Sequence, residues 1–303
     1  MIMVHEEPHG EYYALETLNT RRIPVRKEAF HDISRDLHGS IALGIEAKSP
    51  LFVGSGQIEY EGDQIYQRFA RRGEKFIIPG TSIKGAIRSY AEALSPSCEG
   101  GRCGKERSGH VDNLCLCCSL FGTLGLQGRV NFTDAIAVKG IKPIKHEIRL
   151  RWNPKRVRKG RRFYFHDKPE KDYVLAKIGC ETEVVEALEA GAIFKGEMML
   201  YNVQEWELGL LLLAMGLSPN HRFDLKLGGG KNRLLGSVFF KIDDPLILHK
   251  GEAAFYQSFK KINSSKREKH TNGVVEAYIN WLKKDERNIV ENILKYFKGV
   301  KET

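Results

Sequence analysis

The sequence predicts an α+β fold in which a sheet is layered with helices. A strand, a helix and a second strand follow one another between residues 75 and 132, and the same order returns between residues 193 and 242. This alternation is typical of a sheet covered by helices. With 303 residues, 42% of them apolar, the chain can bury a substantial core.

The regular part of the chain begins after an N-terminal arm at residues 1–38. The arm mixes charged, histidine and aromatic residues without a sustained period, so we expect irregular structure with room for one short helix. Large apolar side chains stand at every second position of residues 41–45, as in a half-buried strand. A loop broken by Gly54 and Gly56 follows, and we expect the core to extend over residues 39–245.

The next strand, residues 75–78, leads into a helix. Apolar side chains recur at helical spacing over residues 83–94, and Pro96 should end the helix. Thr81 and Ser82 are good N-cap residues for it.

The start of this helix is a candidate anion site. Free backbone N–H groups, the hydroxyls of Thr81 and Ser82 and the cations Lys84 and Arg88 are groups that bind phosphates. Ordinary capping beside a solvated basic face accounts for the same residues, so both interpretations stay open.

The remaining elements complete the predicted order. Further strands are expected at residues 128–132, 193–201 and 237–242, with a strongly apolar helix at residues 205–215. From residue 252 the pattern is helical, with a polar break at residues 263–265 and an amphipathic helix at residues 274–297. We therefore expect residues 246–303 to form a helical appendage.

Five of the six cysteines lie close together in an insertion at residues 95–120. Two pairs of thiolates can surround Zn²⁺ tetrahedrally, and four protein ligands leave no open position for catalysis. The predicted ligands of this structural zinc are Cys98, Cys103, Cys115 and Cys118. Cys117 and His110 are alternative ligands, and we expect Cys180 to be a small buried residue.

Residues 139–171 form a basic insertion. It holds 13 Lys and Arg residues and three acidic residues, so its net charge is 13 − 3 = +10. This equals the formal net charge of the whole chain. Its prolines indicate loop or hairpin structure. Aromatic rings lie between its cations, so it can offer charge to phosphates and stacking to bases, although a solvated hairpin is the alternative. The cations predicted to bind RNA are Arg149, Arg151, Lys155, Arg156, Arg158 and Arg161.

A glycine-rich loop at residues 228–236 is a candidate phosphate nest. Gly228, Gly229 and Gly230 let backbone N–H groups approach a phosphate, and Lys231 and Arg233 supply charge. The loop lacks the Walker pattern, and a plain glycine turn explains it equally well.

Several of these segments together resemble the RAMP superfamily, the repeat-associated proteins of CRISPR systems, and specifically the backbone subunits of type III effector complexes. The similar segments, in the family's order, are residues 52–56, residues 76–88, residues 120–135 and residues 227–238. Gly54 and Gly56 of the first segment and Arg129 of the third are among the residues that we expect to bind RNA. The cysteine cluster before residues 120–122 is similar to one branch of these proteins. The resemblance covers residues 40–245.

The resemblance implies a ferredoxin-like, RRM-related core. It also implies a protein that assembles side by side with other effector subunits along guide RNA, which it holds by the backbone for pairing with target RNA. In members that cut target RNA, an aspartate after the first glycine segment acts with a divalent ion such as Mg²⁺, and Asp63 is the nearest match by position.

Two alternatives within the superfamily stay open: a non-catalytic subunit that caps the filament, and an endoribonuclease that processes guide RNA. No apolar run reaches the roughly 18 to 20 residues of a membrane span, and the first residues lack a signal-peptide pattern. We therefore expect a cytoplasmic protein without membrane contact.

Overall fold

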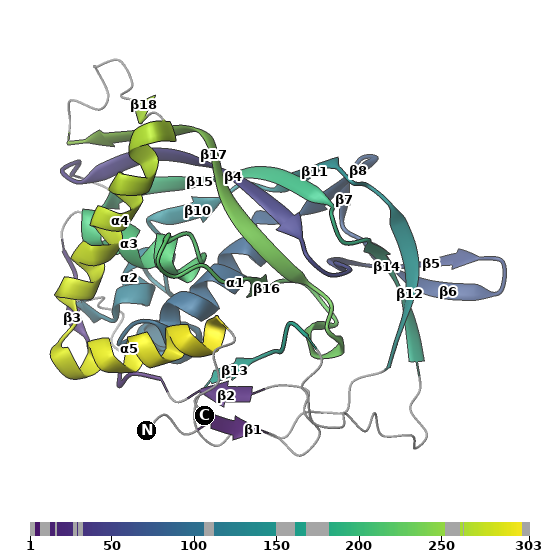
Figure 1. Cartoon of the computed structure of the whole chain (residues 1–303), viewed down its shortest axis with the longest axis horizontal. Coiled ribbons are helices and arrows are strands. Elements are labelled where there is room, and N and C mark those ends of the chain that lie inside the picture. Colours follow the sequence, from purple (N-terminus) through teal and green to yellow (C-terminus); the bar gives the residue numbers. More distant parts are fainter. Residues whose placement is uncertain are drawn as a thin grey trace.

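The computed structural model describes residues 4–6, 13–15, 17–26, 29, 33–105, 112–149, 161–167, 182–251, 261–262 and 264–298. Within these residues the fold is a mixed α+β fold, as predicted. The described strands form a nine-stranded sheet, a four-stranded sheet, a three-stranded sheet and one two-stranded pairing, and the helices gather on one side of the largest sheet (Figure 1). No helix in the described part of the chain is both long and apolar enough to cross a bilayer.

The central sheet is built around three long antiparallel strands. These are β4 (Leu37–Ala47), β15 (Ile193–Val203) and β17 (Ser237–Lys250), with β4 in the middle. Ile41, Leu43 and Ile45 of β4 point into the core, as their alternation predicts. The sheet is completed by β16 (Leu225–Lys226), β11 (Ala135–Lys139), β8 (Lys75–Ile78), β7 (Arg71–Arg72), β10 (Val130–Phe132) and β18 (Lys261–Ile262).

A smaller sheet stands beside the central one and ends in a projecting hairpin (Figure 1). Its strand order is β12 (Pro143–Arg149), β14 (Thr182–Leu188), β6 (Gln64–Phe69) and β5 (Gly54–Glu61). The predicted loop at Gly54 and Gly56 is therefore wrong, because both residues belong to β5, which pairs with β6.

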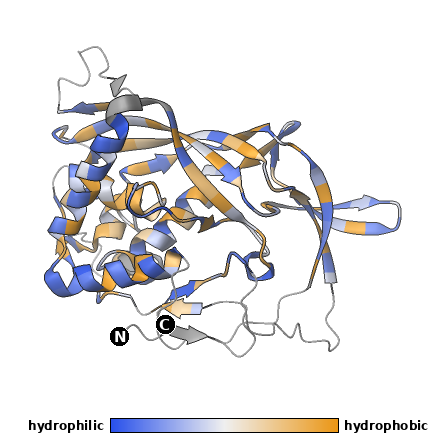
Figure 2. Cartoon of the chain, in the orientation of Figure 1, coloured by the Kyte–Doolittle hydropathy of each residue, from blue (hydrophilic) through white to orange (hydrophobic). Residues whose placement is uncertain are grey.

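Helices α1 (Gly80–Ala93), α2 (Leu116–Phe121) and α3 (Glu205–Ala214) cover the central sheet. The start of α1 differs from the prediction: its N-cap is Pro79, so Thr81 and Ser82 lie in the first turn and make no capping bond. Its end before Pro96 is confirmed. Helix α3 is apolar around most of its circumference, and it is accordingly buried over almost its whole length (Figure 2).

The C-terminal helices pack on α3. Gly209 of α3 lets α4 (Ser264–Trp281) approach, since a Cβ there would lie 2.0 Å from the carbonyl oxygen of Val274. The prediction of a single helix at residues 274–297 is wrong, because α4 ends at Trp281 and a second helix, α5 (Lys284–Phe297), begins after it. The carboxylate of Glu286 caps this new helix by accepting the Lys283 N–H at 2.9 Å.

Two further expectations about chain organisation need correction. The polar break expected at residues 263–265 coincides instead with the start of a helix, because α4 begins at Ser264 and Lys261–Ile262 form β18, which pairs with β17. Residues 252–260, where the helical pattern was expected to begin, lie outside the described residues. Strand β17 also continues to Lys250, past the predicted strand end at residue 242 and past residue 245. The domain boundaries themselves stay predictions.

The N-terminal arm contributes strands rather than a fully irregular segment. Its strands are β1 (Val4–Glu6), β2 (Tyr13–Leu15) and β3 (Ile23–Pro24). Strand β2 pairs with β13 (Arg161–Phe163) of the basic insertion, and β3 pairs with β9 (Asn113–Leu114) of the cysteine-rich insertion. The arm thus ties both insertions to the core.

Candidate nucleic-acid interface

Four segments that are distant in the sequence meet around one pocket of about 420 Å³. Strand β5 contributes Gly54, and helix α1 contributes a face that includes Ser82 and Ser89. Residues 162–164, in the basic insertion, form another wall, and the glycine loop after β16 forms the last. The cations that line the pocket are Arg162, Lys226 and Lys231.

The glycine loop is held against the first glycine segment by a close backbone contact. The N–H of Gly229 donates to the carbonyl oxygen of Phe52 at 2.8 Å. A Cβ at Gly228, whose φ is +88°, would lie 2.1 Å from the same oxygen. Only glycine fits this approach, so the loop is more specific in shape than an ordinary turn.

Lys231 and Arg233 lie in the short 3₁₀ turn η3 (Lys231–Arg233) that follows these glycines. Gly230 adopts the left-handed conformation that starts the turn, with φ of 64°. The Lys231 Nζ lies 5.6 Å from the centre of the Tyr164 ring, so the loop and the basic insertion meet at the pocket. A cation and a ring are therefore adjacent, the pairing used for phosphates and stacked bases.

Helix α1 brings only part of its predicted anion site to the pocket. Ser82 lines the pocket, whereas Thr81, Lys84 and Arg88 do not. The Lys84 Nζ donates to Asn131 Oδ1 at 3.2 Å, and burial lowers the pKa of Lys84, with the charge of Arg88 adding to the effect. The first N–H of the helix, that of Gly80, has no acceptor within the helix. It donates instead to a carboxylate of the protein, Asp134 Oδ1, at 2.9 Å.

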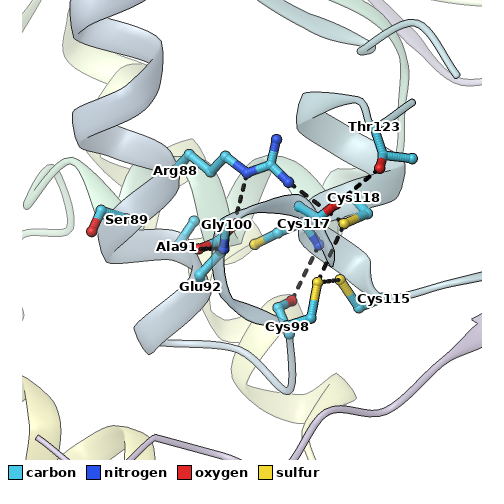
Figure 3. A network of polar contacts seen from close by, with 12 residues as sticks. Arg88, Ser89, Ala91, Glu92, Cys98, Gly100, Cys115, Cys117, Cys118 and Thr123 are labelled. Atoms are coloured by element: carbon cyan, nitrogen blue, oxygen red, sulfur yellow. Dashed lines mark hydrogen bonds and ion pairs between the residues drawn. The ribbon is translucent and has the colours of Figure 1, made fainter. Parts of the chain in front are cut away.

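Arg88 points instead toward the cysteine cluster (Figure 3). Its guanidinium donates to Glu92 Oε1 at 2.7 Å, to the carbonyl oxygen of Gly122 at 2.9 Å and to Cys118 Sγ at 3.5 Å. Glu92 is buried, with 2% of its side chain exposed, and forms a second ion pair with Arg161. Two of the predicted RNA-binding arginines thus converge on one buried carboxylate.

The four predicted zinc ligands lie together. The sulfur atoms of Cys98, Cys103, Cys115 and Cys118 all lie within 4.8 Å of one another. Cys98 Sγ is 3.5 Å from Cys118 Sγ, 3.5 Å from Cys103 Sγ and 3.6 Å from Cys115 Sγ. Four thiolates about 2.3 Å from a tetrahedral Zn²⁺ would be separated by about 3.8 Å. The quartet is therefore consistent with a structural zinc site.

Local structure brings these sulfurs together. Gly100 and Gly101 have left-handed φ values of 60° and 75°, which turn the chain sharply between Cys98 and Cys103. Cys115 is the N-cap of α2 and Cys118 lies in its first turns. The backbone N–H of Cys115 also donates to Cys103 Sγ at 3.5 Å.

Cys117 lies apart from the quartet. Its Sγ is 3.4 Å from Ser95 Oγ, and burial raises the pKa of its thiol to about 12. Cys117 is thus a buried side chain of the core. The alternative ligand His110 lies outside the described residues, as does Cys180.

Arg129, a predicted RNA contact, is part of the core. Its exposure is 2%, and its guanidinium donates to both carboxylate oxygens of Glu207 at 2.6 and 2.8 Å. It also donates to the carbonyl oxygen of Asn202 at 2.6 Å. A guanidinium satisfied in this way holds β10 to the start of α3, and it offers no exposed surface to a ligand.

Asp63 lies in the turn between β5 and β6, at the tip of the projecting hairpin, and is exposed. Gly56, in the same hairpin, has φ of +81° and open space around it. Neither lines the pocket. Of the predicted cations, Arg151, Lys155, Arg156 and Arg158 lie outside the described residues, and Arg149 is described only as the last residue of β12.

Lys226 was not singled out by the sequence, yet it lies at the pocket with 3% of its surface exposed. Its backbone N–H donates to the Tyr90 hydroxyl at 3.1 Å, and its Nζ to the carbonyl oxygen of Leu235 at 3.0 Å. The available signal was a lysine between two leucines directly before the glycine loop. Ser89, another lining residue, gave no sequence signal beyond its helical position.

Comparison with known families gives one match. A family model described as the RAMP superfamily matches residues 44–239, about two thirds of the chain. No curated protein matches the sequence. Proteins of this superfamily bind CRISPR RNA within CRISPR complexes, so membership implies an RNA-binding role of that general kind. The chain belongs to the RAMP superfamily.

Proposed function

We propose that this RAMP superfamily member is an RNA-binding subunit of a type III CRISPR effector complex, which holds guide RNA by its sugar-phosphate backbone. One observation carries the proposal. Three of the four segments that resemble this group, through Gly54, Ser82 and Gly228, meet at a single pocket that also contains three cations. Segments that form one binding surface have to lie side by side in the fold, whereas unrelated turns do not.

The chemistry of the pocket suits phosphates rather than base edges. Arg162, Lys226 and Lys231 offer positive charge, and the glycine loop exposes backbone to a close ligand. Contacts of this kind position a strand without reading its sequence. A guide must be held in this way, because its bases have to remain available for pairing with target RNA.

The wider features of the proposal follow from the same role. The ferredoxin-like, RRM-related core, the guide and target RNA partners and the side-by-side assembly with other effector subunits all belong to it. The basic insertion supports it by its charge, and Tyr164 supports it by placing a ring beside Lys231.

Cleavage of target RNA through Asp63 is a second candidate function. The position of this carboxylate at the exposed tip of a projecting hairpin favours it, because a paired target strand can reach such a tip. Its chemistry would use Mg²⁺ or another divalent ion.

Binding of fluorescently labelled single-stranded RNA tests the proposal. The protein should bind two strands of unrelated sequence with similar affinity, which falls steeply as salt is raised. Replacing two of the three pocket-lining cations by Arg162→Gln and Lys231→Met should lower the slope of log affinity against log salt by about 2. The matched control, Lys195→Met, removes a cation on the solvent-facing side of β15 and should leave the slope unchanged.

Two outcomes would contradict the proposal. One is that the folded protein ignores RNA at low ionic strength. The other is that the double variant and the Lys195→Met control bind with equal affinity and equal salt dependence.

A further inference from the structure

Glu92 lies between the cysteine quartet and the basic insertion. It belongs to α1 and is 2% exposed. Its carboxylate accepts the Arg88 Nε–H at 2.7 Å and the backbone N–H of Gly100 at 3.1 Å, and it forms a second ion pair with Arg161. Gly100 lies in the turn between the first two cysteines of the quartet. One buried carboxylate therefore joins two insertions that are far apart in the sequence.

Arg88 connects this carboxylate to the predicted zinc ligands. Its guanidinium donates to Cys118 Sγ at 3.5 Å and to the carbonyl oxygen of Gly122, the C-cap of α2, at 2.9 Å (Figure 3). A zinc ion held by four thiolates forms a centre of net negative charge, and a guanidinium bonded to one sulfur offsets part of that charge. The quartet and Glu92 thus share one cation.

The turn that presents the Gly100 N–H to Glu92 depends on the metal for its order. Gly100 and Gly101 both have left-handed φ values, and the turn is further held by Thr123 Oγ1, which donates to the Gly101 carbonyl oxygen at 3.2 Å. Glycines lose much backbone freedom when they are ordered, and a bound zinc offsets that cost. Loss of the metal should therefore release the Gly100 N–H from the carboxylate.

On its other side, Glu92 anchors a wall of the pocket. Arg161 begins β13, and its side chain is 11% exposed in the ion pair. Two residues on, the Phe163 ring packs on Tyr90 of α1, with 5.1 Å between ring centres. Successive side chains of a strand point to opposite sides, so these two anchors set the direction of Arg162 between them. Arg162 lines the pocket, whereas none of the four predicted zinc ligands does.

We infer that Glu92 and Arg161 are positioning residues, which couple the zinc ion predicted for the quartet to the pocket wall at residues 162–164. Zinc then raises the affinity of the pocket for its ligand from outside the pocket. The choice of RNA as that ligand rests on the proposed function. Because Phe163 holds the wall without the metal, the effect is partial. Coupling between two binding sites is reciprocal, so bound RNA must tighten zinc binding by the same factor.

Two simpler roles for Arg161 make different predictions. If Arg161 contacts RNA directly, its loss weakens RNA binding, but RNA has no influence on zinc affinity in any protein. If its ion pair is only structural, its loss lowers the stability of the fold and again leaves the two affinities independent. The dependence of zinc affinity on RNA is therefore the readout that separates positioning from both.

The experiment measures zinc affinity by competition with a chromophoric chelator, with and without saturating single-stranded RNA. Arg161→Gln is the main variant because Glu92 keeps its partner Arg88 in it. Arg68→Gln is the matched control, since it removes the same charge from a pair with Glu59 in the projecting hairpin. RNA should tighten zinc binding about fivefold in the wild type and in Arg68→Gln. The effect should vanish in Arg161→Gln and return in part in Arg161→Lys, which keeps a cation opposite the carboxylate.

Three results would overturn the inference. The first is a wild-type protein that holds no zinc. The second is an equal zinc affinity of the wild type with and without bound RNA. The third is the same tightening by RNA in Arg161→Gln as in the wild type.

Hydrogen exchange tests the coupling without RNA. Chelation of zinc from the wild type should speed amide exchange in β13 and in its partner β2, while β4 of the central sheet stays protected. The zinc-loaded Arg161→Gln protein should show the same faster exchange in β13. Unchanged exchange in β13 after chelation, or an equal loss of protection in β4, would also overturn the inference.

The two measurements together separate this inference from the proposed function. If the wild type binds no RNA but chelation speeds exchange in β13 alone of the two strands β13 and β4, the coupling stands and the proposed function fails. If RNA binds while zinc affinity and β13 exchange are both independent of the other site, the proposed function stands and the coupling fails.

Discussion

The backbone N–H of Gly229 donates a hydrogen bond of 2.8 Å to the carbonyl oxygen of Phe52. This bond joins the first glycine segment of the chain to the last, directly beside the pocket. The neighbouring Gly228 has no room for a Cβ, because the same carbonyl oxygen would lie 2.1 Å away. The shape of the proposed RNA surface therefore depends on this single approach.

We predict that Gly228→Ala destabilises the protein and weakens RNA binding. The backbone there has φ of +88°, which costs an alanine about 1–3 kcal/mol, and the clash with Phe52 adds to that cost. Gly191→Ala is the matched control, since Gly191 has a similar φ of +92° but nothing within 4 Å of its Cβ position. Urea unfolding should show a larger loss of stability for Gly228→Ala than for Gly191→Ala, and RNA titration should show a larger loss of affinity. Equal losses would mean that the contact with Phe52 is unimportant.

A buried lysine makes folding stability depend on pH in a known direction. Burial lowers the pKa of Lys226 from 10.5 to about 8, so between these values the unfolded chain holds a proton that the folded chain releases. Raising the pH through this window should therefore favour the folded state at this site. Comparing the free energies of unfolding of the wild type and Lys226→Met at pH 7.5 and pH 9.5 isolates the effect. The free energy of unfolding of the wild type, relative to that of Lys226→Met, should be larger at pH 9.5 than at pH 7.5.

We predict one zinc ion for each chain. Elemental analysis of the purified protein should find it in the wild type and in Cys117→Ala, because Cys117 lies apart from the quartet. Cys103→Ser or Cys118→Ser should lose the metal and unfold at lower urea concentration, since four thiolates then no longer share one ion. A metal content near zero in the wild type would reject the zinc assignment.

Removing the charge of Glu92 should be costly. This carboxylate is 2% exposed, pairs with Arg88 and Arg161 and accepts the N–H of Gly100 at 3.1 Å. Glu92→Gln leaves two guanidinium groups without their partner, and breaking a buried pair in this way costs about 3–5 kcal/mol. Glu59→Gln, in the half-exposed pair with Arg68, should cost about 0–1 kcal/mol. Chemical denaturation of both variants measures the difference.

Target cleavage through Asp63 is tested on the assembled complex with labelled complementary RNA and Mg²⁺. If Asp63 acts in cleavage, regularly spaced products should appear with the wild type and be absent with Asp63→Ala. Glu74 is an exposed carboxylate in the next turn along the chain, between β7 and β8, and Glu74→Gln should leave the products unchanged. Products that persist in Asp63→Ala would exclude this residue, and their absence in every sample would indicate a scaffold subunit.

The sequence by itself determined the features that depend on local patterns. Alternating side chains identified β4, an apolar run identified α3, and the spacing of the cysteines identified the quartet before any distance was known. These predictions succeeded because side-chain period, turn chemistry and ligand spacing act over a few neighbouring residues. The glycine loop was identified for the same reason.

Only the tertiary structure decided what each cation contacts. Arg129 reads as a basic residue of a surface motif, yet β10 places it against Glu207 in the core. Arg88 looks like a free cation on a helix, yet it bonds to Glu92 and Cys118, whereas the unremarked Lys226 reaches the pocket. Whether a charge meets water, a buried carboxylate or a ligand depends on segments that fold over it from far along the chain. A local pattern carries no information about those segments.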